Sequence, residues 1–301
     1  MEDLAPLRSL EVVADRISKS DGTNKILFRA ADGGLVESVL MSGGPRSSPR
    51  FTVCVSCQIG CPAGCSFCAS GIAGFGRNLT TAEIADQVEL FAGRLRAQGK
   101  RLDNVVYMGM GEPFLNYNRV MASIRLITRD GGLGLGTRRV TVSTVGIVPG
   151  IRRFAREPGE VNLAISLHAP DAELRRSIVP YEERYPIGEI LEAARDYVRS
   201  TRRRVSFEYV LLRNTNDGLN LAGDLGRLLT PLRPLAHVNL IPWNPFGDAG
   251  FSASTRERAD RFAAAIRVWG IPATVRYSKG LDIDAACGQL RMQSLLQQRA
   301  S

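Results

Sequence analysis

Five of the six cysteines in this chain fall within fifteen residues, in the run Cys54-Val-Ser-Cys57-Gln-Ile-Gly-Cys61-Pro-Ala-Gly-Cys65-Ser-Phe-Cys68. Thiols crowded in this way are usually paired as disulfides or held by a soft metal. The N-terminus has no apolar core of a signal peptide, so the sequence does not predict export to an oxidising compartment. The run therefore indicates a metal site, whereas Cys287 stands alone near the other end of the chain.

The spacing of these cysteines distinguishes two kinds of metal site. Cys54 with Cys57, and Cys65 with Cys68, form C-x2-C pairs, but only seven residues separate the pairs, fewer than in usual zinc ribbons and fingers. A fifth thiol also exceeds the four ligands of structural zinc. Cys61, Cys65 and Cys68 instead form a C-x3-C-x2-C run that suits an iron–sulfur cluster with one iron left open. We predict a cluster, and a zinc-stabilised binding module is the alternative.

Further motifs along the chain resemble one family, the class A radical S-adenosylmethionine (SAM) methyltransferases of the RlmN/Cfr type, which methylate adenine carbons in ribosomal and transfer RNA. The C-x3-C-x2-C signature, with Phe67 before its third cysteine, marks only the superfamily. The more specific motifs follow the family's order: Cys54-Val-Ser, Gly74-Phe-Gly-Arg-Asn-Leu-Thr80, Gly109-Met-Gly-Glu-Pro113, Arg139-Val-Thr-Val-Ser-Thr144, Ile165-Ser-Leu-His-Ala-Pro170, Ile241-Pro-Trp-Asn-Pro-Phe246 and Asp284-Ala-Ala-Cys-Gly-Gln-Leu290.

The resemblance implies two cofactors and the residues that hold them. Cys61, Cys65 and Cys68 are expected to bind a [4Fe–4S] cluster whose open iron takes the amino and carboxylate groups of SAM. The expected SAM contacts are Gly111, Glu112, Ser143, Ser166, Leu167, His168 and Asn244. His168 is one of two histidines, and a lone histidine is often a hydrogen-bonded structural residue, so both interpretations stay open. The other, His237, lies inside a predicted strand and is interpreted as structural.

The resemblance also implies a two-stage reaction built on cysteine chemistry. Cys287 accepts a methyl group from one SAM, and a radical from a second SAM abstracts hydrogen from the methylated sulfur. The resulting carbon radical adds to an electron-poor sp2 carbon, which is no nucleophile and cannot attack SAM directly. Cys54 then releases the adduct by forming a disulfide with Cys287. Glu37 matches a proton-accepting carboxylate of the family. Cys57, where the family commonly has serine, is interpreted as a bystander, and an alternative partner for Cys287 is the other interpretation.

After the cysteine run, strand-like and helix-like stretches alternate. Strands are predicted at 104–108, 139–143, 161–166, 205–211, 237–241 and 273–277, and helices at 83–95, capped by Thr80 or Thr81, 117–128, 148–156, 187–199, 219–229 and 257–269. About six such repeats favour a parallel, right-handed sheet, whereas a closed barrel would need about eight. We predict an α/β fold, a partial (β/α)6 TIM-like radical SAM barrel.

The N-terminal part is predicted to be a short extension of this barrel. Lys25–Ala30 and Leu35–Leu40 are strand-like and joined by a turn, which predicts a β-hairpin. Residues before Lys19 are expected to form a turn or two of amphipathic helix and little else, and Ser42–Arg50 a loop. We therefore expect an extension at 1–50 and the catalytic domain at 51–301.

The position of the motifs agrees with the predicted fold. In barrels of this kind, active residues follow the C-terminal ends of strands. Glu112 and Asn244 follow predicted strands, Ser143 and Ser166 end them, and His168 lies just beyond one. The Gly109-x-Gly111 motif is expected to let the backbone approach a ligand closely, because glycine has no side chain.

The partner is less well defined than the chemistry. A net charge of +9 admits RNA, although an arginine-rich composition alone gives the same charge. There is no eighteen-residue apolar run to span a membrane, and we expect a cytoplasmic monomer reduced by a donor such as flavodoxin or ferredoxin. RNA-modifying members of the family usually carry a helical accessory domain before the hairpin, and this chain begins almost at the hairpin. RNA is the favoured substrate, and a free nucleoside or small metabolite of a specialised pathway is the alternative.

Overall fold

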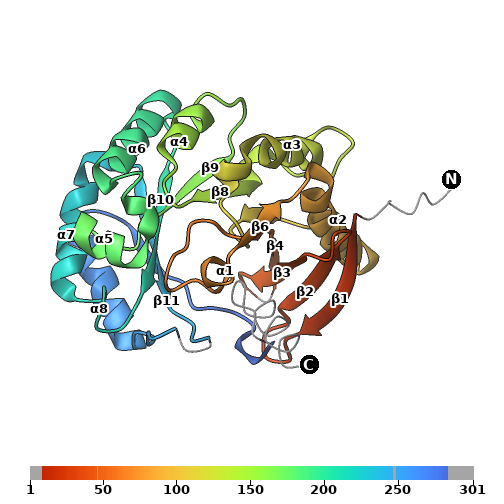
Figure 1. The fold of residues 1–301 in the computed structure, drawn as a ribbon, viewed down its shortest axis with the longest axis horizontal. Helices are drawn as coiled ribbons and strands as arrows, with labels where there is room; N and C mark the ends of the chain where they lie inside the picture. Colours follow the sequence, from red (N-terminus) through yellow and green to blue (C-terminus); the bar gives the residue numbers. More distant parts are fainter. Residues whose placement is uncertain (1–8, 46, 247–248, 284–301) are drawn as a thin grey trace.

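A computed structural model describes residues 9–45, 47–246 and 249–283 of the chain. Its centre is a ten-stranded sheet in the order β1-β2-β3-β4-β7-β8-β9-β10-β11-β12 (Figure 1). Every neighbouring pair from β4 to β12 is parallel, and the pairs from β1 to β4 are antiparallel. The predicted α/β class with a parallel sheet is confirmed.

Six strand–helix units and a final strand build the parallel part. The strands are β4 (Arg50–Cys54), β7 (Asn104–Tyr107), β8 (Val140–Thr144), β9 (Asn162–Ser166), β10 (Val205–Leu211), β11 (Ala236–Pro242) and β12 (Ala273–Val275). The helices that follow the first six are α2 (Thr81–Ala97), α3 (Tyr117–Thr128), α4 (Val148–Phe154), α6 (Ile187–Thr201), α7 (Leu219–Leu229) and α8 (Arg256–Arg267). All six predicted strands and all six predicted helices are present. The sequence did not predict β4 or the short helix α5 (Ala172–Ile178) between β9 and α6.

The N-terminal strands extend this sheet. β2 (Asn24–Ala30) and β3 (Leu35–Gly43) form the predicted hairpin, but β1 (Leu10–Ile17) pairs with β2, so the prediction of little structure before Lys19 is wrong. Only Leu10 of β1 is buried, and charged residues fill much of the strand, so its alternating pattern is weak. β3 in turn pairs with β4, which places the hairpin and the barrel strands in one sheet. The division at residue 50 remains a prediction.

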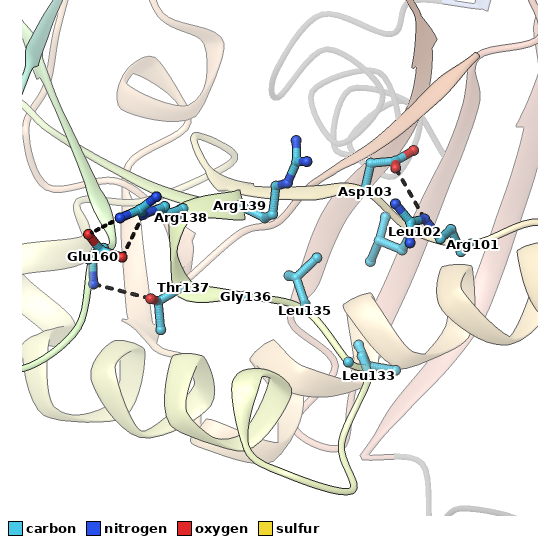
Figure 2. A pocket seen from close by; sticks show the side chains of 11 residues that line it. Arg101, Leu102, Asp103, Leu133, Leu135, Gly136, Thr137, Arg138, Arg139 and Glu160 are labelled. Carbon is cyan, nitrogen blue, oxygen red and sulfur yellow. Dashed lines mark hydrogen bonds and ion pairs between the residues drawn. The ribbon is translucent and has the colours of Figure 1, made fainter. Parts of the chain in front are cut away.

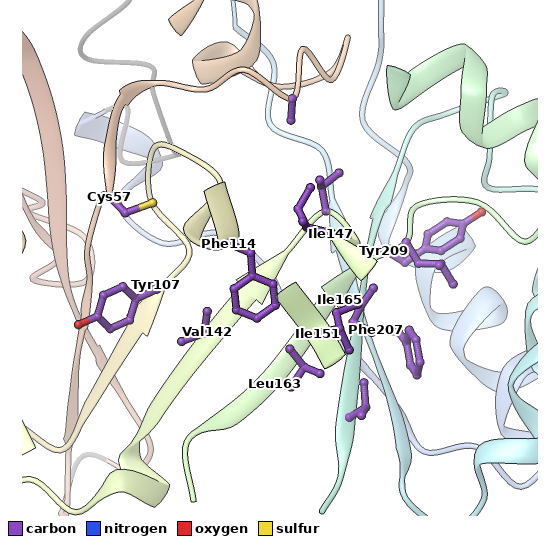
Figure 3. Packing of buried hydrophobic residues seen from close by; sticks show 14 of the residues in the cluster. Cys57, Tyr107, Phe114, Val142, Ile147, Ile151, Leu163, Ile165, Phe207 and Tyr209 are labelled. Carbon is purple, nitrogen blue, oxygen red and sulfur yellow. The ribbon is translucent and has the colours of Figure 1, made fainter. Parts of the chain in front are cut away.

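The two faces of the parallel sheet differ: the face toward the helices is apolar, and the inner face carries polar side chains. Val142, Leu163, Ile165 and Phe207, from adjacent strands, are at most 1% exposed and form the core beneath the helices (Figure 3). Each such side chain contributes about 1.5–3 kcal/mol when it is fully buried. Because successive side chains of a strand point to opposite faces, the residues between these positions point inward. Several of them are polar, so the inner face of the barrel is a polar surface.

The first turn of α2 shows why its helix begins where the sequence predicts. The Thr80 hydroxyl accepts the Glu83 amide at 3.2 Å, and the Glu83 carboxylate accepts the Thr80 amide at 2.8 Å, which is a capping box. We expect Thr80→Ala to lower the free energy of unfolding by about 1 kcal/mol in urea titration, because it orphans a helical N–H. Thr81→Ala, at the first helical position, is the control. Equal, small losses for both variants would contradict the cap.

No helix in the described ranges is long and apolar enough to cross a membrane.

Candidate functional site

The cysteine loop lies between β4 and α2 and is closed at its base by a small sheet. β5 (Gln58–Gly60) pairs antiparallel with β6 (Phe75–Asn78). The chain between them carries the predicted cluster ligands and the one-turn helix α1 (Ala69–Ile72). Gly64, between the first two ligands, has φ +66°, a left-handed conformation that glycine adopts without strain. The loop is therefore folded back on itself with both of its ends fixed.

The three thiols of the loop lie near one another, with Cys65 buried and Cys61 and Cys68 half-buried. Burial raises the pKa of Cys61 to about 12 and that of Cys65 well above its usual value, and the neighbouring Cys68 contributes to both shifts. Such thiols ionise together only if a cation compensates their charge, which iron supplies. In the described residues, no group of three His, Cys, Asp or Glu side chains is arranged around a single metal ion. The three thiols therefore fit an iron–sulfur cluster by their chemistry and spacing, and they do not form a site for a single ion.

Contacts from distant strands hold the cysteine loop against the barrel. The Ser66 amide donates to the Ile178 carbonyl at 3.1 Å, and the Trp243 indole donates to the Phe67 carbonyl at 2.8 Å. The ring of Phe67 also meets the ring of His168 edge-on, with centroids 4.7 Å apart. Since Trp243 follows β11 and His168 follows β9, the loop is fastened to the C-terminal ends of the strands, where the site was predicted.

The glycines after β7 let another group approach their backbone closely, as the sequence predicts. In the structure, the group that approaches is the cysteine segment. A Cβ atom at Gly109 would lie 2.6 Å from the Val55 carbonyl oxygen, and one at Gly111 would lie 2.9 Å from the Cys57 sulfur. The Met110 carbonyl accepts the Cys57 amide at 2.9 Å between these two positions. The motif therefore fastens the loop after β7 to the segment that leads to the cluster ligands. Contact between Gly111 and SAM remains a prediction.

Glu112 is a buried carboxyl that joins two strand ends. It is 3% exposed, and its oxygens accept the Phe114 amide at 2.9 Å and the Val145 amide at 2.6 Å. Burial raises the pKa of Glu112 to about 7, although these hydrogen bonds oppose the shift. The side chain is thus fixed beside the cysteine loop, and its charge contributes to the pKa shifts of Cys61 and Cys65. The Thr144 side chain is a third hydrogen-bond partner. A carboxylate has about four acceptor positions, so one remains for the amino group that the predicted SAM contact would require.

Other predicted SAM contacts gather at neighbouring strand ends. The hydroxyls of Ser143 and Ser166, on β8 and β9, lie 3.3 Å apart. The Leu167 side chain is fully buried, so only its backbone is suited to a polar ligand. The Asn244 amide, after β11, donates to the Ser278 hydroxyl. The structure thus brings the two serines together, and the ligand contacts of all four residues stay predictions.

His168 has a structural role that the sequence left open. Its φ is +64°, its ring Nδ1 accepts the Val210 amide at 3.1 Å, and its carbonyl accepts the Asn216 side chain at 2.9 Å. Burial lowers the pKa of His168 to about 3, so the ring is neutral and carries its hydrogen on Nε2. The ring joins β9, β10 and the cysteine loop.

Cys54 lies apart from the ligand cysteines, beside a buried ion pair. Glu37 and Lys25 are 3% and 0% exposed, and their charged atoms are 2.7 Å apart. In the sheet, Cys54 and Lys25 both pair with Val39, which places their side chains on one face. Burial raises the pKa of Cys54 to about 12, and the charge of Lys25 opposes that shift while Glu37 adds to it. The structure thus brings the predicted thiol and the predicted proton acceptor together.

Lys25 is the site residue that the sequence reasoning missed. A signal existed, because Lys25 and Glu37 stand near opposite positions of the predicted hairpin, where cross-strand charge pairs form.

The remaining cysteines differ in what the structure describes. Cys57 is 2% exposed within the hydrophobic core. Cys54, Cys61, Cys65 and Cys68 are free thiols. Cys287, with the rest of its motif, lies outside the described residues.

A cavity of about 390 Å³ lies elsewhere, at the N-terminal ends of β7 and β8 (Figure 2). Three arginines and two acidic residues line it, and Arg138 pairs with Glu160 at 2.5 Å. Because it lies at the opposite ends of the strands from the cysteine loop, this cavity is separate from the candidate site.

Comparison with known proteins first defines the class. The model of the Radical SAM superfamily matches residues 55–220, from the cysteine segment to the start of α7. A crystal structure of a radical SAM methyltransferase from Sphaerobacter thermophilus superposes with a TM-score of 0.89 at 52% identity, covering 94% of this chain and 82% of that one.

Individual relatives narrow the class to a family. The dual-specificity RNA methyltransferase RlmN of Symbiobacterium thermophilum is 48% identical over 286 residues, which are 95% of this chain and 75% of the relative. RlmN of Thermus thermophilus is 49% identical over 273 residues, 91% of this chain and 75% of the relative. This chain belongs to the RlmN family of radical SAM methyltransferases. Its cofactors are those of the family, a [4Fe–4S] cluster and SAM, and the zinc-stabilised module is set aside.

Proposed function

We propose that this enzyme methylates an sp2 carbon of adenine in ribosomal or transfer RNA through a methylated Cys287. The observation that carries the proposal is the position of Cys54: a thiol outside the C-x3-C-x2-C run lies beside the buried pair of Glu37 and Lys25. The names of the relatives, which are RNA methyltransferases, support RNA as the substrate. A thiol and a carboxylate together suit a reaction that must release a covalent adduct and remove a proton.

The cofactors divide the remaining work. Cys61, Cys65 and Cys68 would hold the cluster, and Glu112, Ser143 and Ser166 would contact SAM beside it. When bound, the two cofactors supply the methyl group and one-electron chemistry, with electrons from a donor such as flavodoxin or ferredoxin.

Cys54 and Glu37 act at the end of the reaction. Cys54, once deprotonated, attacks the sulfur of Cys287, so that an S–S bond forms and the S–CH2 bond to the substrate breaks. The electron pair of that bond stays on the CH2 carbon, which takes up a proton and becomes the new methyl group. Glu37 accepts the proton lost from the substrate carbon. Because the pKa of Cys54 is raised to about 12, the resting residue is a neutral thiol, poorly reactive until a base is brought to it.

We expect Cys54→Ala to accumulate a covalent protein–RNA adduct, because nothing then attacks Cys287. Labelled RNA that migrates with the protein on a denaturing gel is the measurement. Cys57→Ala, which removes a neighbouring buried thiol, is the control and is expected to turn over. Normal turnover by Cys54→Ala would show the two-cysteine reaction to be wrong. Cys287→Ala is expected to take up no labelled methyl group.

The substrate class needs its own experiment. Reduced enzyme with methyl-labelled SAM is incubated with total RNA and, in parallel, with a small-molecule extract. Label is expected in adenine recovered from RNA. Label found only in small molecules would overturn the RNA assignment and favour a free nucleoside or metabolite.

A further inference from the structure

A row of polar side chains crosses the inner face of the barrel from β8 to the residue that follows β12. We call Ser143, Ser166, Glu208, Asn239 and Arg276 the inner polar row. Ser166 pairs with Glu208 in the β9–β10 register, and Glu208 pairs with Asn239 in the β10–β11 register. The Asn239 amide donates to Glu208 Oε1 at 2.8 Å, and Arg276 Nε donates to Asn239 Oδ1 at 3.1 Å. The row begins at the two serines predicted to contact SAM.

Glu208 faces the interior of the barrel, although it is almost fully buried. Its neighbours in β10, Phe207 and Tyr209, are both 0% exposed, and the ring of Tyr209 packs on Phe262 of α8, 5.3 Å between centroids. Alternation along the strand therefore points Glu208, which is 7% exposed, away from the helices. Its carboxyl lies on the same face as the hydroxyls of the row.

Glu208 lacks the ion pair that two other deeply buried carboxyls of this chain form. Glu37 is paired with Lys25, and Glu182 with Arg175, each at 2.7 Å. Among the described residues, no lysine or arginine forms an ion pair with Glu208, whose hydrogen-bond donor is a neutral amide. Burial raises the pKa of Glu208 to about 7. Burying a carboxyl whose oxygens lack hydrogen-bond donors costs free energy of folding. A buried carboxyl of this kind with a shifted pKa is therefore a candidate for binding a ligand that supplies the missing donors.

The surroundings of Glu208 indicate what kind of ligand it accepts. Arg276, one step along the row, contributes a positive charge that offsets the carboxylate, so a cationic ligand gains little there. Neutral hydroxyl donors suit the position, and a carboxylate that binds a ribose hydroxyl is a known solution in dinucleotide-binding folds. We propose that Glu208 binds ribose hydroxyls of an adenosine unit held inside the barrel, with Asn239 fixing the carboxyl. The adenosine unit belongs either to SAM or to the substrate, and the second source rests on the proposed function.

Binding measurements on the cluster-containing enzyme test this assignment without turnover. One arm compares S-adenosylhomocysteine with its 2′-deoxy analogue by calorimetry. The other compares an RNA hairpin that carries the target adenosine with one that carries 2′-deoxyadenosine there. The wild type is expected to prefer the ribose form by about tenfold or more in one arm, as a charged hydrogen bond provides. Glu208→Gln is expected to lose most of that preference.

The outcomes distinguish the ribose of SAM from that of the substrate, and they distinguish ribose binding by Glu208 from the proposed methylation of RNA. Preference lost in the first arm places the ribose of SAM on Glu208, and preference lost in the second places that of the substrate. Equal binding of both forms by the wild type in both arms would overturn the assignment, even if the variant failed to fold. Retention of the preference by Glu208→Gln would do the same. Glu257→Gln, whose side chain is 83% exposed on α8, is the matched control. Failure to methylate RNA would leave the first arm unaffected.

Discussion

Replacing Arg175 with methionine is expected to lower the free energy of unfolding by about 3–5 kcal/mol, because the carboxylate of Glu182 then stays buried without its cation. The two side chains are 0% and 1% exposed, with Nη1 and Oε2 2.7 Å apart. The guanidinium also donates to the carbonyls of Leu167 at 3.1 Å and Val145 at 2.5 Å. One side chain thus satisfies acceptors at the ends of two strands, and methionine can replace none of these bonds.

Anaerobic denaturant unfolding, followed by circular dichroism, measures this loss. The control is Arg152→Met, whose pair with Glu192 is 3.7 Å long with side chains 50% and 64% exposed. Exposed pairs of this kind contribute about 0–1 kcal/mol, so the control should be nearly neutral. Replacing Arg175 and Glu182 together by apolar residues is expected to recover part of the stability. A single-variant loss no larger than that of the control would contradict the role of Arg175.

Replacing Cys65 with serine is expected to remove the cluster and lower activity by at least about 100-fold, since even changes to outer-shell partners of metal ligands cost about 10–100-fold. Cys65 is 8% exposed and lies between the other two ligand cysteines in sequence. Two thiols cannot bind three irons, and a serine hydroxyl is a poor substitute for a soft thiolate.

Iron and sulfide analysis of anaerobically purified protein, with its visible absorbance, measures the cluster independently of turnover. Cys57→Ala is the matched control, because it removes a buried thiol eight residues earlier that is not in the predicted ligand set. Full iron content in Cys65→Ser, or loss of iron in Cys57→Ala, would mean that the ligand set is assigned wrongly.

The repeating part of the fold could be predicted because its signals are local. Val205–Leu211 and Leu219–Leu229 have the predicted bounds, since each is a regular pattern between turn residues. β4 was missed because its last residue, Cys54, is the first of the cysteine run, and the whole segment was interpreted as a metal-binding loop. β1 was missed because Glu11, Asp15 and Arg16 interrupt its apolar residues.

The candidate site shows the same division between local and long-range information. Motifs located Glu112, Ser143 and Ser166 at strand ends, because motif and strand occur in one stretch of sequence. The burial of Arg175 could not be read in this way: its helix has only seven residues, and an arginine there suggests a solvated surface. What buries it are the ends of β8 and β9, which are brought together only by the completed sheet.

The antiparallel pairing of β3 with β4 has a practical consequence for anyone who trims this enzyme. A fragment cut to the superfamily match at 55–220 would lose β4 with Cys54 and, with β2 and β3, the Lys25–Glu37 pair. It would also leave the backbone of β7 as a bare sheet edge, open to pairing with other chains. In the intact protein the edge strand on this side of the sheet is β1, and its exposed charged side chains discourage pairing with other chains. The N-terminal strands therefore cover the edge of the parallel sheet and also carry the buried Lys25–Glu37 pair.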